Sequence, residues 1–195
     1  MNKRTQRGVG LLDILIALTL ITGMVAVWMG MARETGEQAD ITALQHVLSS
    51  VEQRVRAAYV NDADYAGLTT TAAAQRGLIP EGMYQQSGVE LIGIHPGGNV
   101  MRVGAGNYSG VNGADQTNIG YWIQFEGLNR ATCVSLLMQT AQNYLAVHVG
   151  TGKPTGAVAT GLTRRIDAAN RVVTATTATT WCSSPSANTL RWETN

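Results

Sequence analysis

Two cysteines are the side chains of this sequence whose number and spacing most directly limit the possible chemistry. Cys133 and Cys182 are the only cysteines among the 195 residues. Two thiols are too few for a four-cysteine zinc site, and they are too far apart in the sequence for a CxxC redox pair. We therefore expect one structural disulfide, which requires an oxidising compartment.

Asp13 is an acid next to a long apolar segment. The residues from Ile14 to Ala32 are uncharged and mostly apolar, and Val9 to Leu12 would otherwise extend this segment. A carboxylate within a membrane helix costs about 2.5 to 3.5 kcal/mol on insertion scales, so it needs a cationic partner unless it lies at the hydrated headgroup level. If the chain were cut after Gly8, the new amine of Val9 would lie four residues before Asp13, and a neighbouring copy could supply it.

Motifs for other chemistry are incomplete. A P-loop around Gly152-Lys153 would need glycine where Val147 stands and serine or threonine where Pro154 stands. The glycine-rich residues 104–110 lack the dinucleotide-binding spacing, and we predict a flexible loop there. The three histidines are dispersed and match no zinc or nucleophile–base pattern: His46, His95 and His148. We predict no enzymatic activity, no metal site and no cofactor.

The composition predicts a folded, weakly charged protein. The chain is 45% hydrophobic, which with its length predicts one domain with room for an appendage. Charged residues make up 14% of the chain, against about 25% in an average globular protein, and the formal net charge is +1. No basic excess is available to neutralise a phosphate backbone, so we predict no nucleic-acid partner. A surface with few charges suits close packing against like copies.

The N-terminal elements predict a membrane segment that continues into an amphipathic helix. Lys3, Arg4 and Arg7 precede the apolar residues 14–32, which would form about 28 Å of helix and span a bilayer with the basic end in the cytoplasm. Apolar residues then recur at three- and four-residue spacing, at Ile41, Leu44, Leu48, Val51 and Val55. Because no proline occurs before Pro80, we predict one helix from about Val9 to Tyr59.

The rest of the chain predicts an antiparallel sheet with two short helices. Turn residues follow the long helix, and the helices are expected at Thr70–Gly77 and Asn129–Thr140. The candidate strands are Val89–Ile94, Asn99–Val103, Ile119–Phe125, Tyr144–Val149, Ala157–Leu162, Arg171–Ala175 and Thr189–Trp192. These elements predict an α+β fold with a predominantly antiparallel sheet.

Two segments resemble type IV pilins. The sequence from Arg7 to Leu18, RGVGLLDILIAL, resembles the prepilin cleavage and assembly motif of that family. The sequence from Tyr121 to Val134, YWIQFEGLNRATCV, is similar to the region of bundle-forming pilins where a central strand leads into a helix with the first disulfide cysteine. The chain resembles the type IVb branch of the family in two respects: its first mature residue is not phenylalanine, and its mature length is 187 residues (195 minus 8). This branch includes bundle-forming pilins and thin-pilus pilins of conjugative plasmids.

The resemblance assigns roles to three N-terminal residues. In this family a membrane peptidase cuts after the glycine of a short basic leader and methylates the new amine, and an acid at the fifth mature position guides assembly. The resemblance implies a leader of residues 1–8, cleavage between Gly8 and Val9, N-methylation of Val9, and an assembly role for Asp13. The family usually has glutamate where Asp13 stands, and aspartate keeps the charge with a shorter reach.

The resemblance also implies an architecture and a function. Residues 9–60 would form one helix, in which residues 14–32 first span the inner membrane and later form the filament core. The second half of this helix would pack on the sheet of a globular domain at residues 61–195. A disulfide would bound the region 133–182 within that domain. The chain would be the major subunit of an extracellular pilus for adhesion, aggregation or conjugative mating. Its partners would be identical subunits, the prepilin peptidase, the assembly machinery, and a host or recipient-cell surface.

Two other interpretations fit parts of the same sequence. A minor pilin or a pseudopilin of type II secretion would share the N-terminal motif without forming the bulk of a filament. Alternatively, Gly30-Met31-Ala32 offers small residues that a signal peptidase could recognise, which would fit a secreted or membrane-anchored extracytoplasmic protein of another kind.

Overall fold

The computed structural model describes residues 18–19, 39–109, 115–167 and 172–195. Contacts divide the chain into two units, Met1–Ala39 and Asp40–Asn195, and the fold below is that of the second unit. Most of the first unit, including most of the predicted membrane segment 14–32, lies outside the described residues. Within the described ranges, no helix combines the length and apolar character needed to cross a membrane.

A helix over residues 39–58 buries one apolar face. The predicted stripe is confirmed here, because Leu44, Leu48, Val51 and Val55 are buried and Val47 joins them in the core. The opposite face, which includes His46, is exposed. The predicted part of this helix before residue 39 lies outside the described residues, apart from Leu18 and Thr19.

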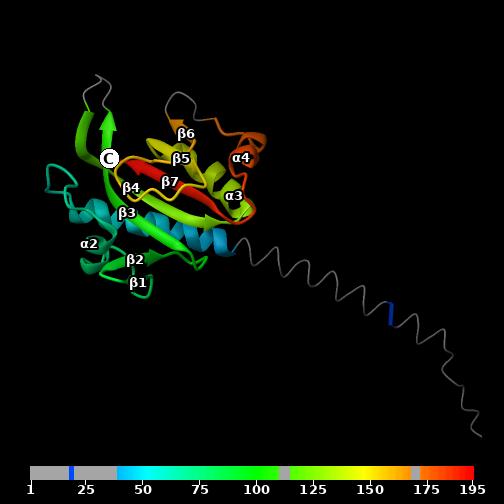
Figure 1. The fold of residues 1–195 in the computed structure, drawn as a ribbon, viewed down its shortest axis with the longest axis horizontal. Helices are drawn as coiled ribbons and strands as arrows, with labels where there is room; N and C mark the ends of the chain where they lie inside the picture. Colours follow the sequence, from blue (N-terminus) through cyan, green and yellow to red (C-terminus); the bar gives the residue numbers. More distant parts are fainter. Residues whose placement is uncertain (1–17, 20–38, 110–114, 168–171) are drawn as a thin grey trace, which may run out of the picture. The chain divides into compact units, whose positions relative to one another are not determined.

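Seven strands of the described chain form one sheet. Their bounds are β1 Tyr84–Ser87, β2 Glu90–Ile94, β3 Val100–Ser109, β4 Asp115–Leu128, β5 Ala146–Gly150, β6 Arg164–Asp167 and β7 Asn188–Thr194. The order across the sheet is β1-β2-β3-β4-β7-β5-β6, and each neighbouring pair is antiparallel (Figure 1). The last strand, β7, therefore lies between β4 and β5 in the middle of the sheet and not at an edge.

Short helices precede the first strand and connect later strands. Their bounds are α2 Thr70–Gln75, α3 Arg130–Thr140, the 3₁₀ helix η1 Ala141–Asn143, and α4 Ala175–Trp181. Each α-helix begins at a polar cap: the side chains of Thr69, Asn129 and Thr174 accept hydrogen bonds from backbone N–H groups of the first turn. These caps explain why α2 and α3 begin where the sequence pattern predicts them.

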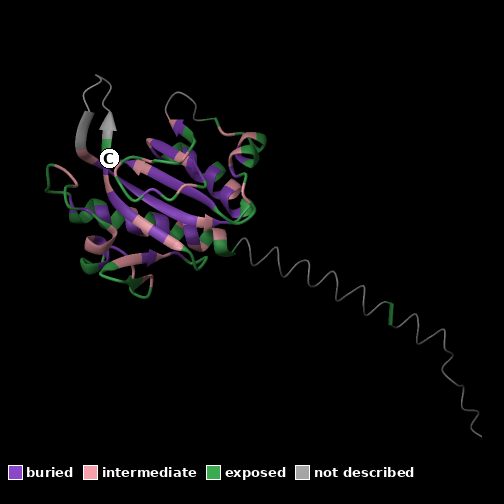
Figure 2. Ribbon diagram, in the orientation of Figure 1, coloured by how far each residue is buried: buried purple, intermediate pink, exposed green. Residues whose placement is uncertain are grey.

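The two faces of the sheet differ in chemistry. Along β4, Tyr121, Ile123 and Phe125 join the hydrophobic core with the 39–58 helix, and the alternate residues Trp122, Gln124 and Glu126 face the other way, on what we call the outer face. Buried residues concentrate along the central strands and on the 39–58 helix (Figure 2). The sheet thus has one apolar face, which packs against the helix, and one polar face, which is the outer face.

Three sequence predictions are wrong, two because of contacts between distant segments and one because of a local helix cap. Residues 104–109, expected as a flexible loop, belong to β3, where a Cβ on Gly104 would lie 2.5 Å from the indole of Trp122 on β4. Residues 157–162, expected as a strand, belong instead to a long connection between β5 and β6. In the expected strand 171–175, residues 172–174 are irregular and Thr174 caps α4. Residue 171 lies outside the described chain.

Candidate functional site

The residues assigned to processing and assembly are not in the described structure. Gly8, Val9 and Asp13 all lie outside the described residues. The structure does describe the predicted disulfide region 133–182 and the polar contacts that attach it to the sheet. Together, this disulfide and these contacts form the candidate site.

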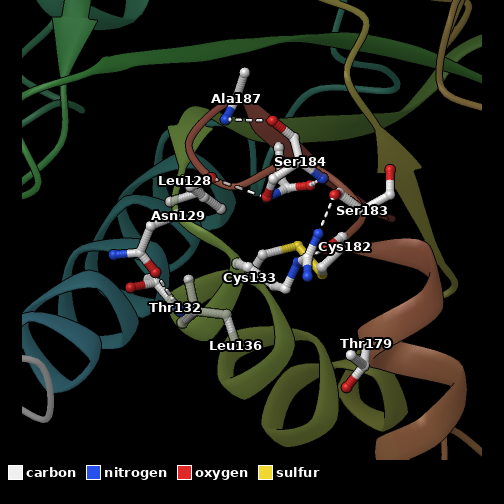
Figure 3. The surroundings of a disulfide bond; sticks show 12 residues. Leu128, Asn129, Thr132, Cys133, Leu136, Thr179, Cys182, Ser183, Ser184 and Ala187 are labelled. Carbon is white, nitrogen blue, oxygen red and sulfur yellow. Dashed lines mark hydrogen bonds between the residues drawn. A yellow bond between two sulfur atoms is a disulfide. The ribbon is translucent and has the colours of Figure 1, made fainter.

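The structure joins Cys133 and Cys182 in a disulfide. The two Cα atoms are 5.9 Å apart, and both residues are fully buried. Cys133 lies in the first turn of α3, and Cys182 follows the last residue of α4 (Figure 3). The bond therefore ties the beginning of one helix to the end of another and closes the region that contains η1, β5, β6 and α4.

A polar turn attaches this region to the middle of the sheet. The Arg130 guanidinium donates from Nε to the Cys182 carbonyl at 3.2 Å and from Nη2 to the Ser183 carbonyl. Asn188, the first residue of β7, donates from Nδ2 to the carbonyls of Leu128 (3.0 Å) and Ser184 (2.6 Å). These bonds fix the ends of β4 and β7 next to the disulfide.

A second polar group attaches the 39–58 helix to the sheet. Glu52 accepts a hydrogen bond from the Tyr144 hydroxyl at 2.8 Å and pairs with Arg56 at 3.0 Å. Arg56 also donates to the Tyr121 hydroxyl at 3.1 Å and to Thr194 Oγ1 at 3.0 Å. Burial raises the pKa of both tyrosines, so both hydroxyls stay protonated at neutral pH. The helix is therefore bound to β4, β7 and the residue after η1.

The outer face contains a fully buried arginine. Arg191 on β7 donates to the carbonyls of Gly156 at 2.8 Å and Ala157 at 2.5 Å, and its guanidinium lies 4.1 Å from the ring centroid of Trp122. These bonds hold residues 151–163, which we call the strap, over the outer face of the sheet. Burial lowers the pKa of Arg191 to about 10, and its charge is compensated by Glu193, whose Oε1 lies 3.5 Å from Arg191 Nε.

The structure also places the other two histidines, which the sequence left without a catalytic or zinc-binding pattern. His95 is buried, its Nε2 lies 2.9 Å from the Glu126 carbonyl, and the backbone N–H of Gly97 donates to its Nδ1 at 3.1 Å. Because Nδ1 accepts, Nε2 must donate, which defines a neutral ring in a packing role. His148 Nε2 lies 3.2 Å from the Glu193 carboxylate. Burial alone would raise the pKa of Glu193, but the close contact with His148 and the nearby Arg191 guanidinium lower it.

The arrangement offers no metal ligand set within the described chain. Among these residues, no three His, Cys, Asp or Glu side chains lie close enough together to hold an ion. A groove of about 540 Å³ lies on the outer face beside β3, with Glu90, Arg102 and Thr155 among its lining residues. Its Arg102 is already paired with Glu126 at 2.8 Å. The contacts described above connect elements of the fold to one another.

Sequence reasoning missed the arginine and the strap. The predicted strand Thr189–Trp192 alternates apolar and polar residues, which places Arg191 on the face opposite Leu190 and Trp192. That alternation was a usable signal for an outward-facing arginine. Its acceptors were not recognisable, because Gly156 lies directly before, and Ala157 begins, the segment 157–162 that was predicted as a strand.

Comparisons with known proteins agree with this fold. A family model described as PilS N terminal matches residues 37–195. The crystal structure of a type IVb pilin from Salmonella typhi superposes with a TM-score of 0.56 at 18% identity, over 81% of this chain and 99% of that one. TcpA, a type IV pilin from Vibrio cholerae El Tor biotype, superposes with a TM-score of 0.56 at 20% identity, over 80% and 99%. No curated protein matches significantly.

Proposed function

Because the chain belongs to the PilS family of type IV pilins and has the fold of type IVb pilins, we propose that it is the major structural subunit of a type IV pilus. In this proposal a prepilin peptidase removes residues 1–8 and methylates Val9. Residues 14–32 anchor the precursor in the inner membrane and then enter the filament core. The assembled pilus is extracellular and serves adhesion, aggregation or conjugative mating.

The main support for this proposal is the family match over residues 37–195. The packing of the 39–58 helix supports it as well. One face of that helix is covered by the sheet, while His46, Ser49 and Gln53 on the other face are exposed. A helix covered on one side only can pack its open side against the helices of other copies. Pilins are structural subunits, so the family also supports a role without catalysis.

The experiment that tests the proposal is mass spectrometry of the mature protein from sheared surface filaments. We expect a chain that begins at Val9 and carries one methyl group on its amine. A mature terminus at Arg33, or an intact Met1, would contradict the prepilin interpretation. As a control, Gly8→Val should leave uncut precursor in the inner membrane.

The same preparation distinguishes the major subunit from its nearest alternative. A major pilin forms the bulk of the sheared filament, whereas a minor pilin or a pseudopilin is present in few copies. We therefore expect this chain to be the dominant band on a stained gel of sheared filaments. A trace amount within filaments made mostly of another protein would assign it to the minor class.

A further inference from the structure

The groove of about 540 Å³ on the outer face lies between several elements of the described fold. Its lining includes Gly104 on β3 and Trp122 on β4, and its walls come from residues 67–71, from the beginning of β2 and from residues 155–157 of the strap. This volume lies within the range of about 300–1,000 Å³ that is typical of small-molecule sites. The groove is therefore large enough to hold a small-molecule ligand.

Several polar side chains of this groove have hydrogen-bonding capacity to spare. Glu90, Asn118 and Thr155 line it, and their side chains make no hydrogen bond or ion pair with another described residue. Arg102 donates to Glu126 through Nε at 2.8 Å, and its two Nη groups have no partner within the described ranges. These four lining residues come from β2, β4, the strap and β3, so the fold and not the local sequence brings them together.

The hydrogen-bonding types of these groups indicate which ligand would match them. A carboxylate only accepts hydrogen bonds and a guanidinium only donates them, whereas an amide and a hydroxyl do both. The groove therefore offers donors and acceptors together. An ionised phosphate only accepts and an ammonium group only donates, so each would leave part of this set unpaired. A hydroxyl group donates and accepts, so a ligand with several hydroxyl groups matches the whole set.

Charge and polarity exclude other classes of ligand. Glu126 compensates the charge of Arg102, so the carboxylate of Glu90 remains as a negative charge that disfavours anions. Glu90 is the one carboxylate among the described lining residues, whereas Ca²⁺ takes about six to eight oxygen ligands, several of them from carboxylates. Three of the large apolar side chains of the lining are buried: Leu68, Val103 and Trp122. These observations favour an uncharged ligand rich in hydroxyl groups.

The walls of the groove are held in place by bonds within the fold. Thr70 Oγ1 donates to the Val103 carbonyl at 3.1 Å and accepts from its N–H at 3.0 Å, which fixes α2 against β3. Arg191 fixes the strap through two hydrogen bonds to its carbonyls. Asn118 has a φ of +61°, unlike any other non-glycine residue of the described chain, and its carbonyl accepts from the Tyr65 N–H at 2.7 Å. A preformed site lowers the entropic cost of binding.

We infer that this groove binds a neutral saccharide, through hydrogen bonds between its hydroxyl groups and the side chains of Glu90, Asn118 and Thr155. For its biological role the inference rests on the proposed function, because it supplies an adhesive contact with saccharides on the surface of another cell. The binding itself is a property of one subunit. A filament repeats the site many times, so weak binding by each subunit adds up to firm attachment.

Titration of the full chain with disaccharides tests this inference. The chain is held in micelles of lauryldimethylamine oxide, a detergent without a sugar headgroup, and the neutral probes are maltose, cellobiose, lactose and di-N-acetylchitobiose. The reporter is the indole N–H resonance of Trp122, which lines the groove and donates to the Ala105 carbonyl at 2.9 Å. The Trp122→Phe variant assigns this resonance. We expect a saturable shift with at least one neutral probe. The same disaccharide with a uronic acid in place of one sugar should bind at least about tenfold more weakly, because its carboxylate then meets that of Glu90.

Matched variants locate the binding in the groove. Asn118→Gly keeps the left-handed backbone and removes the amide, and Thr155→Val keeps the shape and removes the hydroxyl. Together they should weaken binding of the neutral probe by at least about tenfold, since two hydrogen bonds to the ligand are lost. Glu90→Gln should remove the discrimination against the acidic probe. Glu81→Gln changes an exposed acid that does not line the groove, and it should alter neither result.

The outcomes separate this inference from the proposed function. The inference is wrong if no neutral probe gives a saturable shift, if the acidic probe binds more tightly than its neutral counterpart, or if the two-residue variant binds with unchanged affinity. Thermal unfolding checks that this variant folds, and if it does not, unchanged discrimination in Glu90→Gln decides against the inference. Surface filaments without saccharide binding would refute only the inference. Saccharide binding by a chain that forms no filaments would refute the proposed pilus and support the binding site.

Discussion

Asp13 is the residue on which the proposed assembly mechanism depends. It is the acid that interrupts the apolar N-terminal sequence, and we propose that its carboxylate pairs with the Val9 amine of a neighbouring subunit. Their attraction is strong only where the surroundings exclude water. Asp13→Asn keeps the shape and removes the charge, so subunits should insert in the membrane more easily but fail to be recruited. We expect precursor processing to continue and surface filaments to disappear in electron micrographs.

A matched substitution separates charge from shape at this position. Asp13→Glu keeps the carboxylate with the length that is usual in the family, and it should still assemble. If Asp13→Asn forms filaments at the level of the unmodified chain, Asp13 is a hydrated residue at the membrane boundary and the proposed ion pair does not exist.

His95 should make the stability of the domain sensitive to mild acid. Burial lowers the pKa of His95 below its ordinary value of 6.5, while the unfolded chain takes up a proton near that value. The neutral His95 ring therefore contributes its full stabilisation of the fold above about pH 6.5. This contribution is lost as the pH falls through the folded pKa, and the free energy of unfolding then decreases by at most about 1.4 kcal/mol per pH unit. Urea unfolding at a series of pH values should show this decline in the free energy of unfolding.

Two substitutions identify the group responsible. His95→Gln keeps a donor for the Glu126 carbonyl and removes the titration, so its free energy of unfolding should change less between pH 6.5 and 5.5. His46→Gln, at an exposed position, should leave the profile unchanged. Parallel profiles for the unmodified protein and His95→Gln would show that other groups cause the acid sensitivity.

At the scale of elements, the disulfide connects two helices that are far apart in the sequence. It joins α3 to the end of α4 across 49 positions of sequence. On the chain-entropy model, closing a loop of about 50 residues stabilises the fold by about 4 kcal/mol. Replacing both cysteines with alanine should lower the free energy of unfolding by about this amount in a urea titration. The accumulated level of subunits should fall as well, because domains of this size are only marginally stable.

The redox state provides the control for this prediction. The disulfide residues are fully buried, so the folded protein should resist reductant that reduces the bond readily in urea. The unmodified protein unfolded with reductant should then match the double alanine variant. Equal thiol counts with and without reductant in denatured mature protein would show that the bond is not formed.

The elements that the sequence predicted are those whose signals are local. The stripe of the 39–58 helix follows a helical period, and α3 follows the cap at Asn129. The extension of β3 through residues 104–109 could not be predicted, because glycine there serves a contact with Trp122 on the neighbouring strand. The strap could not be predicted either, because Arg191 determines its position from the far end of the chain.

At the scale of the whole molecule, the sheet is completed by the last strand. The chain leaves the sheet after β4 to form α3 and η1, returns as β5 and β6, forms α4, and then inserts β7 between β4 and β5. The register pairs Trp192 with Ile123 on one side and with Val147 on the other. No local signal specifies these pairings, so the order of strands was beyond sequence reasoning. The proposed assembly residues lie at the opposite end of the chain, outside the described structure.

This topology predicts that the domain cannot fold without its final strand. A chain truncated after Ala187 loses the fully buried Leu190 and Trp192 from the core and leaves β4 and β5 without their common neighbour. Burying a large aromatic side chain alone stabilises a core by about 3–5 kcal/mol, which is comparable to much of the stability of a domain. We expect the truncated chain to show no cooperative thermal transition and to be digested rapidly by protease. Removing only the exposed Asn195 is the matched control and should change neither result. A cooperative transition in the longer truncation would mean that the two halves of the sheet are stable without β7.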